Sequence, residues 1–295
     1  MKRGAKLSNV LKDAERLRLS FERYGLSGGT IRFFRKVIYD HYRREGRDLP
    51  WRKTRSPYRI LVSEVMLQQT RVDRVLRKYP QFIEAFPDLR SLAVAPLKEV
   101  LGAWQGLGYN RRAMGLKAIA LEAAKSGKGR MPVDSDALRD LPGIGAYTAS
   151  ALRCFAHGRA EPMIETNIRS VFIHFFFHGK TGVSDREIMP LVSRTLDKKD
   201  PRKWNYALMD YGVMLKKETS NPGKRSLHYQ RQSPFEGSGR QLRGKILKIL
   251  LAGSRLRQDD LVGQTGADAP RVEAALEGLV RDGLLIKKEG VFNIP

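Results

Sequence analysis

The turn within residues 141–151 constrains the fold more than any other stretch of the chain. Its sequence is Leu-Pro-Gly-Ile-Gly followed by Ala-Tyr-Thr-Ala-Ser-Ala, a turn that continues into a helix. Gly143 and Gly145 permit a tight turn and leave backbone N–H groups uncovered just before that helix. Those donors and the positive end of the helix dipole form a site for a phosphate oxygen. An ordinary connection between helices is the alternative, because Pro-Gly pairs are common in turns.

The sequence on both sides of this turn has helical periodicity. Apolar side chains recur at helical spacing between residues 33 and 42 and again between residues 116 and 123. Ser56-Pro57 is a good helix start, because the serine hydroxyl caps the helix and the proline needs no N–H there. Strand patterns are few between residues 30 and 215. We therefore expect this part of the chain to be mostly α-helical.

A second, compact pattern follows the turn-rich stretch 218–239. Three amphipathic helical patterns occupy residues 242–280, and two short apolar runs then flank residues 287–290 like a two-stranded wing. This arrangement is typical of a winged helix-turn-helix module, which often places its third helix in a DNA groove. Protein–protein packing is the alternative, because Glu273 and Glu277 dilute the positive charge of that helix.

The charge balance narrows the choice of partner. The chain has 55 Lys and Arg against 31 Asp and Glu, a formal net charge of +24, which predicts a polyanionic partner such as nucleic acid. The basic residues are densest in residues 1–55 and 216–248. No apolar run approaches the roughly 18 residues of a membrane span, so we expect no membrane partner. The lone Cys154 excludes an internal disulfide and a multi-thiolate metal site.

One acidic residue interrupts an otherwise apolar helical pattern. Glu64 lies within residues 60–70, Ile-Leu-Val-Ser-Glu-Val-Met-Leu-Gln-Gln-Thr, which are apolar nearly all round the expected helix. Burial disfavours the charged form of a carboxyl and raises its pKa, which suits it to donate a proton near neutral pH. The alternative is a polar stripe, Ser63 and Glu64, that faces water.

Four motifs follow one another along the chain: residues 47–52 (Arg-Asp-Leu-Pro-Trp-Arg), 63–72, 106–109 (Gly-Leu-Gly-Tyr) and 141–151. Together they resemble the MutY-type adenine DNA glycosylases of the helix-hairpin-helix (HhH-GPD) superfamily, over residues 31–232. The resemblance implies that Glu64 protonates a ring nitrogen of a flipped-out adenine. Flipping is needed because the glycosidic bond of a stacked, paired base is out of reach.

The resemblance also implies further DNA contacts. Gln69 and Tyr109 match side chains that wedge into the base stack, and Gly143 and Gly145 match a hairpin that grips phosphate. For the aromatic residues, core packing is the alternative. The expected base pocket is lined by Arg47, Trp51, Arg52, Leu67 and Val72. At the position next to Asn205, where relatives usually carry a Gln or Glu that faces the base, this chain has Tyr206, and we include it in this pocket.

A second carboxylate is implied by residues 162–171. They align with the segment where the superfamily carries an aspartate that stabilises the positive charge left on the sugar. This chain has Glu165 there, one methylene longer. We expect the pocket to have adapted to it, a slow enzyme being the alternative. Asn167 matches a polar residue that helps hold the sugar and water, with a helix cap as the alternative.

Tyr147 stands where bifunctional relatives carry a lysine that forms a Schiff base. A phenol cannot form that imine, so we expect a monofunctional glycosylase that leaves an abasic site. The Tyr147 hydroxyl is instead expected to be available for a hydrogen bond to Glu165.

The iron–sulfur cluster of the family has no ligands here. Its four cysteines would fall on Lys216, Gly223, Ser226 and Gln232, after Met-Asp-Tyr-Gly at residues 209–212. None is a thiolate and such clusters need about four, so we expect no metal and no cofactor. Lys216, Lys224 and Arg225 are instead expected to keep this DNA-facing loop basic, with packing in place of metal to order it.

These observations predict a mostly α, two-lobed helical HhH-GPD core with a small C-terminal winged-helix domain. The expected parts are a basic N-terminal extension (1–30), a core (31–217), a basic loop or linker (218–239) and the winged helix (240–295). Within the core, one lobe is a six-helix barrel at about 56–160, and the second combines 31–55 with 161–217. From the resemblance we expect the winged helix to stand in place of the Nudix-like domain that recognises 8-oxoguanine in relatives.

The expected function is hydrolysis of the N-glycosidic bond of adenine mispaired with 8-oxoguanine or guanine. The expected partner is mismatched or damaged double-stranded DNA, bound by a monomer. A cytoplasmic, nucleoid-associated location follows if the source is prokaryotic. One alternative is an HhH glycosylase for thymine or uracil opposite guanine. The other is a non-catalytic winged-helix DNA-binding protein, although binding alone does not require an acid in the pocket.

Overall fold

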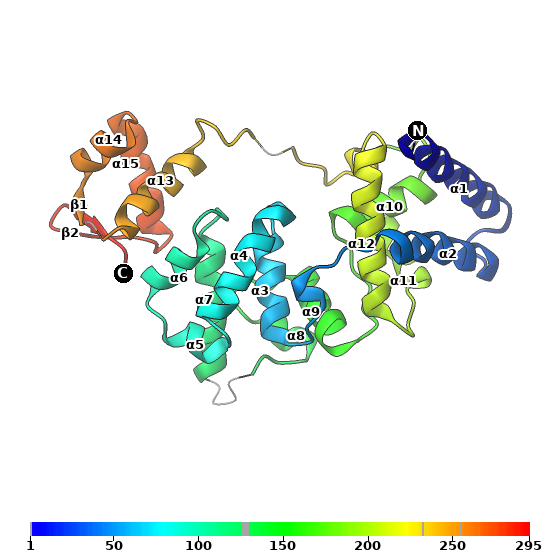
Figure 1. Cartoon of the computed structure of the whole chain (residues 1–295), viewed down its shortest axis with the longest axis horizontal. Coiled ribbons are helices and arrows are strands. Elements are labelled where there is room, and N and C mark those ends of the chain that lie inside the picture. The colour runs from blue at the N-terminus through cyan, green and yellow to red at the C-terminus, as the bar shows by residue number, and fades with distance from the viewer. Residues whose placement is uncertain (1, 126–129, 232, 254) are drawn as a thin grey trace. The chain divides into compact units, whose positions relative to one another are not determined.

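A computed structural model describes residues 2–125, 130–231, 233–253 and 255–295 (Figure 1). Its elements are almost all helical, as the periodicity predicts, and a small sheet lies near the C-terminus. In chain order they are α1 (Lys2–Tyr24), α2 (Gly28–Glu45), η1 (Pro50–Arg52), α3 (Pro57–Leu67), α4 (Val72–Ala85), α5 (Leu89–Val94), α6 (Leu97–Trp104), α7 (Arg111–Lys125), α8 (Ser135–Arg139), α9 (Ala146–His157), α10 (Thr166–Phe176), α11 (Asp185–Thr195), α12 (Pro201–Glu218), η2 (Pro222–Arg225), α13 (Gly239–Leu251), β1 (Leu256–Arg257), α14 (Gln258–Thr265), α15 (Ala269–Arg281), β2 (Ile286–Lys288) and β3 (Val291–Asn293).

The chain divides into two compact units. The first combines Met1–Arg55 with Ala146–Arg231, and the second combines Ser56–Gly145 with Gln232–Pro295. In the first unit α12 packs along α10 and α2 (Figure 1). Its core is aromatic: the Phe34 ring makes edge-to-face contacts with Phe172, Phe175, Phe176 and Trp204 at centroid distances of 5.2–5.7 Å. Such contacts fix the crossing of these helices more tightly than aliphatic packing alone.

The second unit begins at α3, which is buried on all sides. Ser56 caps the helix by accepting from the Arg59 N–H, and Pro57 occupies its first turn. Every residue from Ile60 to Met66 is buried. A helix this uniformly apolar has to lie at the centre of its unit, and α4 and α7 pack against it. The sequence feature that predicts a buried Glu64 is thus also the one that places α3 in the core.

The C-terminal module contains the elements expected of a winged helix. Helices α13, α14 and α15 pack on one another, and the sheet has the antiparallel order β1-β3-β2. Asp268 caps α15, which the proline at residue 270 helps to start. The expected two-stranded wing gains a third strand, because Leu256 and Arg257 pair with Phe292 and Val291. Two residues are too few to give a strand pattern in the sequence.

The observed units divide the chain differently from the expected lobes. The boundary falls before α9, whereas the sequence placed residues up to 160 in the first lobe. Residues 2–24 form α1, whose Leu17 is fully buried and whose Phe21 meets Phe176 edge to face at 5.2 Å. This stretch is therefore part of the first unit instead of an extension to it. Within the described parts of the chain, no helix has the length and apolar character to cross a membrane.

Candidate active site and DNA-contact loops

Glu64 is the buried acid that the sequence predicts. It lies in the third turn of α3, and its residue is 9% exposed between the fully buried Val62 and Met66. The other polar residue of the stripe, Ser63, turns back on its own helix by donating to the Ile60 carbonyl at 2.7 Å. The alternative of a stripe that faces water is wrong, because both residues are buried.

Two loops lie at the C-terminal end of this helix in the second unit. One, residues 68–71, joins α3 to α4, and the other, residues 105–110, joins α6 to α7. Gln69 in the first has φ +54° and Tyr109 in the second has φ +48°. Non-glycine residues rarely adopt this conformation, and where they do the strain often marks a functional site. Both side chains are exposed, as required of groups that enter a base stack.

Arg112, in the first turn of α7, joins these two contact loops. Its Nη1 donates to three carbonyls at the end of α3, those of Val65, Met66 and Gln68, at 2.6–2.9 Å. Its Nη2 donates to the Thr70 hydroxyl at 3.0 Å and to the carbonyls of Leu107 and Gly108 at 3.2 and 2.9 Å. Its Nε reaches the Tyr109 carbonyl at 3.4 Å. One guanidinium thus fixes the backbone around both strained residues.

Burial lowers the pKa of Arg112 to about 10, so the guanidinium stays charged at neutral pH. Arg112 belongs to none of the motifs that indicate the site, yet its sequence context carries a signal. The first turn of α7 holds Arg111 and Arg112 and no acid. Cations there oppose the helix dipole, so another interaction must hold them.

The Tyr109 side chain and the predicted hairpin complete the description of the second unit. Arg240 of α13 donates to the Tyr109 hydroxyl at 2.6 Å. In the predicted hairpin, Gly143 has φ +79° and both Gly143 and Gly145 are exposed, while Ile144 between them is buried. The positive φ is the conformation for which the turn requires glycine. The phosphate contact itself remains a prediction.

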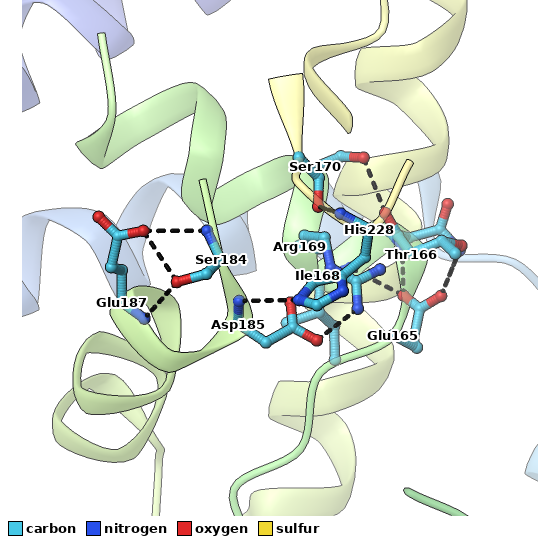
Figure 2. Close-up of polar contacts among 11 residues, drawn as sticks. Glu165, Thr166, Ile168, Arg169, Ser170, Ser184, Asp185, Glu187 and His228 are labelled. Atoms are coloured by element: carbon cyan, nitrogen blue, oxygen red, sulfur yellow. Dashed lines mark hydrogen bonds and ion pairs between the residues drawn. The ribbon is translucent and has the colours of Figure 1, made fainter. Parts of the chain in front are cut away.

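In the first unit, Glu165 lies at the start of α10 (Figure 2), where Asn167 contacts it. The Glu165 carboxylate accepts from the N–H groups of Asn167 and Ile168 at 2.8 Å, so Glu165 is the helix cap. The Thr166 hydroxyl donates to it at 3.1 Å and the Asn167 amide Nδ2 at 3.0 Å. Its extra methylene is accommodated by folding the carboxylate back onto the helix N-terminus, whose dipole favours negative charge.

The hydrogen bond expected from the Tyr147 hydroxyl to Glu165 stays a prediction. Tyr147 lies half-buried in the first turn of α9. The alternative for Asn167, a helix cap, is wrong, because Glu165 fills that position.

Lys216 of α12 reaches the same group. Its Nζ donates to the Asn167 Oδ1 at 2.8 Å. Burial lowers the pKa of this ammonium, and the charge of Glu165 opposes the shift. Lys216 is half-buried against α10, whereas the sequence predicted an exposed, DNA-facing lysine.

A second cluster in the first unit is built on Asp210 of α12. Asp210 accepts from the Arg47 N–H and Nε at 2.8 and 2.6 Å, and from both Nη atoms of Arg52 at 2.8 Å. Burial alone would raise the pKa of Asp210, but the hydrogen bonds and charge of Arg52 hold it below its ordinary value. The Arg52 guanidinium also lies 4.4 Å over the Tyr206 ring, which stacks on Phe155 at 4.4 Å.

This Asp210 cluster (Asp210, Arg47, Arg52 and Tyr206) places three predicted pocket residues together. Tyr206 is only 6% exposed, and its ring is occupied by packing. Among the other pocket residues, Trp51 is buried in η1, whereas Leu67 and Val72 are half-buried at the end of α3 and the start of α4. In the sequence, Asp210 stands out only as part of the Met-Asp-Tyr-Gly motif. It is also an acid within an apolar helical pattern, the same signal that indicates Glu64, and this signal would have predicted its burial.

The remaining loop residues differ in exposure. Lys224 is exposed in η2, as expected of a DNA contact. Arg225 instead turns inward, donating to the carbonyls of Phe177 and, at 3.0 Å, Ile173. It thereby fastens η2 to the end of α10. A parallel bridge between Val183 and Ser226 secures the same loop.

The positions of the family's cluster ligands do not fit an iron–sulfur cluster. Lys216 is bonded to Asn167, and a Cβ on Gly223 would lie 2.7 Å from the Ser170 Oγ. Ser226 is buried and forms the parallel bridge with Val183, and Gln232 lies outside the described residues. Cys154 is buried in α9, where burial raises its pKa to about 12, so it is a poor thiolate ligand. The described residues contain no group of three or more His, Cys, Asp or Glu arranged to hold a metal ion.

Comparison with known proteins agrees with the fold and the motifs. Residues 62–196 match the family described as HhH-GPD superfamily base excision DNA repair protein. The chain is 32% identical over 277 residues to the adenine DNA glycosylase of Mycobacterium tuberculosis, covering 86% of this chain and 91% of that protein. It is 34% identical over 186 residues to the thymine/uracil-DNA glycosylase of Pyrobaculum aerophilum, covering 60% and 80%.

Among solved structures, that of a thermostable thymine-DNA glycosylase superposes with a TM-score of 0.56 at 27% identity, covering 62% of this chain and 86% of that one. The helical architecture, the hairpin and these similarities define a DNA glycosylase of the HhH-GPD superfamily. Within that superfamily, the chain belongs to the MutY-type adenine DNA glycosylases.

Proposed function

We propose that the chain hydrolyses the N-glycosidic bond of adenine mispaired with 8-oxoguanine or guanine in duplex DNA. The observation that carries this proposal is Glu64, a carboxyl buried in an apolar helix whose C-terminal end meets the two contact loops. Binding alone gives no reason to bury an acid there, because a buried carboxyl costs free energy. Membership of the MutY-type family supports adenine as the excised base.

The reaction needs a proton for the base and a negative charge near the sugar. Glu64 protonates a ring nitrogen of adenine, so that the base departs with the electron pair of the broken bond. The sugar then carries positive charge, which the Glu165 carboxylate stabilises. Water adds to the anomeric carbon and loses a proton, which leaves an abasic site. Because Tyr147 cannot form an imine, the strand stays intact.

DNA is the partner of the chain, and the net charge of +24 supports binding through phosphates with a strong dependence on salt. The proposal includes a monomer that acts without an iron–sulfur cluster. The loop that would carry the cluster is held by the inward-facing Arg225 and by the bridge from Val183 to Ser226. We extend the proposal to action in the cytoplasm of a prokaryotic cell, on nucleoid DNA.

A second candidate is excision of thymine or uracil opposite guanine. The similarity to the thymine/uracil-DNA glycosylase supports it, as does Tyr206, where relatives carry a Gln or Glu toward the base. The packing of Tyr206 against Phe155 leaves the pocket without that polar side chain. Adenine remains favoured because the similarity to an adenine glycosylase covers more of the chain.

The test uses duplexes with A opposite 8-oxoguanine, A opposite G, T opposite G and U opposite G, followed by alkali to cleave abasic sites. Breaks are expected with the adenine duplexes only after alkali. No break with either adenine duplex would refute the proposal, and breaks without alkali would refute the monofunctional reaction. Glu64→Gln should lower excision by about 10²–10⁴-fold, the usual contribution of a general acid, while binding survives.

A further inference from the structure

Lys216 lies where the family has its first cluster ligand, yet its side chain belongs to the group around Glu165. Three polar groups form a chain: the Lys216 Nζ donates to the Asn167 Oδ1 at 2.8 Å, and the Asn167 Nδ2 donates to the Glu165 Oε2 at 3.0 Å. The backbone brings them together, because Gly212, one turn before Lys216, touches Asn167. A Cβ on Gly212 would lie 2.4 Å from the Asn167 carbonyl oxygen.

The orientation of the Asn167 amide is restrained from both of its ends. A carboxylate only accepts and an ammonium only donates, whereas an amide does either, depending on which end faces the partner. One orientation of the Asn167 amide satisfies both neighbours: oxygen to the ammonium and nitrogen to the carboxylate. The Glu165 carboxylate by itself favours this orientation, and the Lys216 ammonium anchors the far end of the amide, so that without Lys216 the amide is held from one side only.

The other three donors to Glu165 do not fix its position in the same way. Two are backbone N–H groups that hold one oxygen, Oε1. The third is the Thr166 hydroxyl, on an exposed residue and at a longer 3.1 Å. The position of Oε2 therefore depends mainly on the Asn167 amide. A glutamate needs this second restraint more than an aspartate does, because it has one more rotatable bond.

We propose that Lys216 is a positioning residue of the glycosylase, which orients the Asn167 amide so that the amide holds the Glu165 carboxylate toward the sugar cation. This inference rests on the proposed function of Glu165. It also gives a function to the residue at the position of the family's first cluster ligand. There the Lys216 side chain, on α12, is connected to the Glu165 carboxylate instead of to a metal cluster.

The experiment compares two duplexes that contain no base at the target position. One carries tetrahydrofuran, a neutral mimic of the abasic sugar, and the other carries a pyrrolidine, its cationic mimic. The wild type should bind the cationic mimic more tightly. The ratio of the dissociation constant for tetrahydrofuran to that for pyrrolidine therefore reports on the carboxylate. General loss of fold or of DNA affinity changes both constants and cancels in this ratio.

Lys216→Met should lower that ratio and the single-turnover excision rate by about 10–100-fold, since a catalytic group misplaced by about 1 Å can cost a hundredfold. Lys216→Arg, which still donates, should recover most of both. If Lys216 acted only through its charge, its removal would strengthen binding of the cation. An unchanged or increased ratio in Lys216→Met would therefore overturn the proposal, as would failure of Lys216→Arg to differ from Lys216→Met.

Two controls separate this inference from the proposed function. Lys217→Met removes the same charge one residue away, from an exposed side chain, and should leave the ratio unchanged. Glu165→Gln should remove the preference for the cationic mimic, so that the two dissociation constants become equal. If Glu165→Gln leaves the ratio unchanged, the function proposed for Glu165 fails. If Glu165→Gln removes the preference while Lys216→Met does not alter the ratio, only the positioning role of Lys216 fails.

Discussion

Replacement of Gly212 by alanine places a methyl group where α12 crosses α10. The added Cβ would lie 2.4 Å from the Asn167 carbonyl oxygen and 2.7 Å from its Cβ, whereas ordinary contacts begin at 3.4 Å. The two helices must therefore separate locally by about 1 Å, since backbone atoms of a packed helix have no rotamer to change. The backbone that moves carries Asn167, and with it the hydrogen bond that holds Glu165.

The expected cost has two parts. Overpacking a core contact lowers the free energy of unfolding by about 1–3 kcal/mol. A shift of about 1 Å at the carboxylate lowers the excision rate by about a hundredfold. Gly115→Ala in α7 is the matched control, because that helical glycine has nothing within 4 Å of its added Cβ. It should gain up to about 1 kcal/mol from helix propensity, without loss of rate.

Urea unfolding and single-turnover excision of adenine measure the two parts separately. Gly212→Ala with wild-type stability and wild-type rate would refute the reasoning, because the α10–α12 contact would then be loose enough to accept a methyl group. A loss of stability with an unchanged rate would show that Asn167 and Glu165 do not depend on this helix contact. Either result would also weaken the case for Lys216, which approaches Asn167 from the same face of α12.

Two further predictions concern the buried charges. Arg112→Met should lower excision at least tenfold and weaken the discrimination between mispaired and paired duplexes in a gel-shift titration. Arg112→Lys should recover only part of the excision rate and of the discrimination, because an ammonium cannot make the seven hydrogen bonds that the planar guanidinium makes. If Arg112→Met still discriminates between mispaired and paired duplexes as the wild type does, Arg112 has no function in the contact loops. Asp210→Asn should lower the free energy of unfolding by about 3–5 kcal/mol in urea, because Arg52 and Arg47 lose their buried counter-ion. The stability contributed by Asp210 is present above its ordinary pKa of 3.8 and is lost as pH falls through the lower folded value, so Asp210→Asn should flatten the acid limb of the stability–pH curve.

The sequence predicts best those features that one local pattern determines. The apolar run around Glu64 predicts both a helix and its burial, and both are found. Gly143 is predicted to occupy a turn, and it has the φ that favours glycine. The third helix of the winged-helix module begins within one residue of the proline that predicts its start. In each case the cause lies within a few residues of the effect.

The features that sequence reasoning missed depend on partners far along the chain. Arg112 acts on carbonyls more than forty residues away, at the end of α3. In the sequence, Lys216 is one more basic residue of a predicted DNA-facing loop, but in the structure its Nζ donates to the Asn167 Oδ1. A basic residue gives the same signal whether it faces phosphate or a carbonyl group. Charge counting alone therefore overstates the number of DNA contacts in this chain.

The distribution of cations bears on the proposal that this chain acts without an iron–sulfur cluster. A cluster would order the loop after α12 through four strong bonds to one centre. Here the same loop is held by several weaker interactions. They are Arg225 on the end of α10, the bridge from Val183 to Ser226, and Asp185, which forms an ion pair with Arg169 and whose backbone N–H donates to the His228 Nε2 (Figure 2). Each contributes only about 1–3 kcal/mol. Two of them involve α10, the helix that Glu165 caps: Arg225 at its C-terminal end and Arg169 in its first turn. Because of that placement, these interactions can stabilise the start of α10 as well as the loop itself, and substitutions in the loop should affect excision through Glu165 before they affect DNA binding.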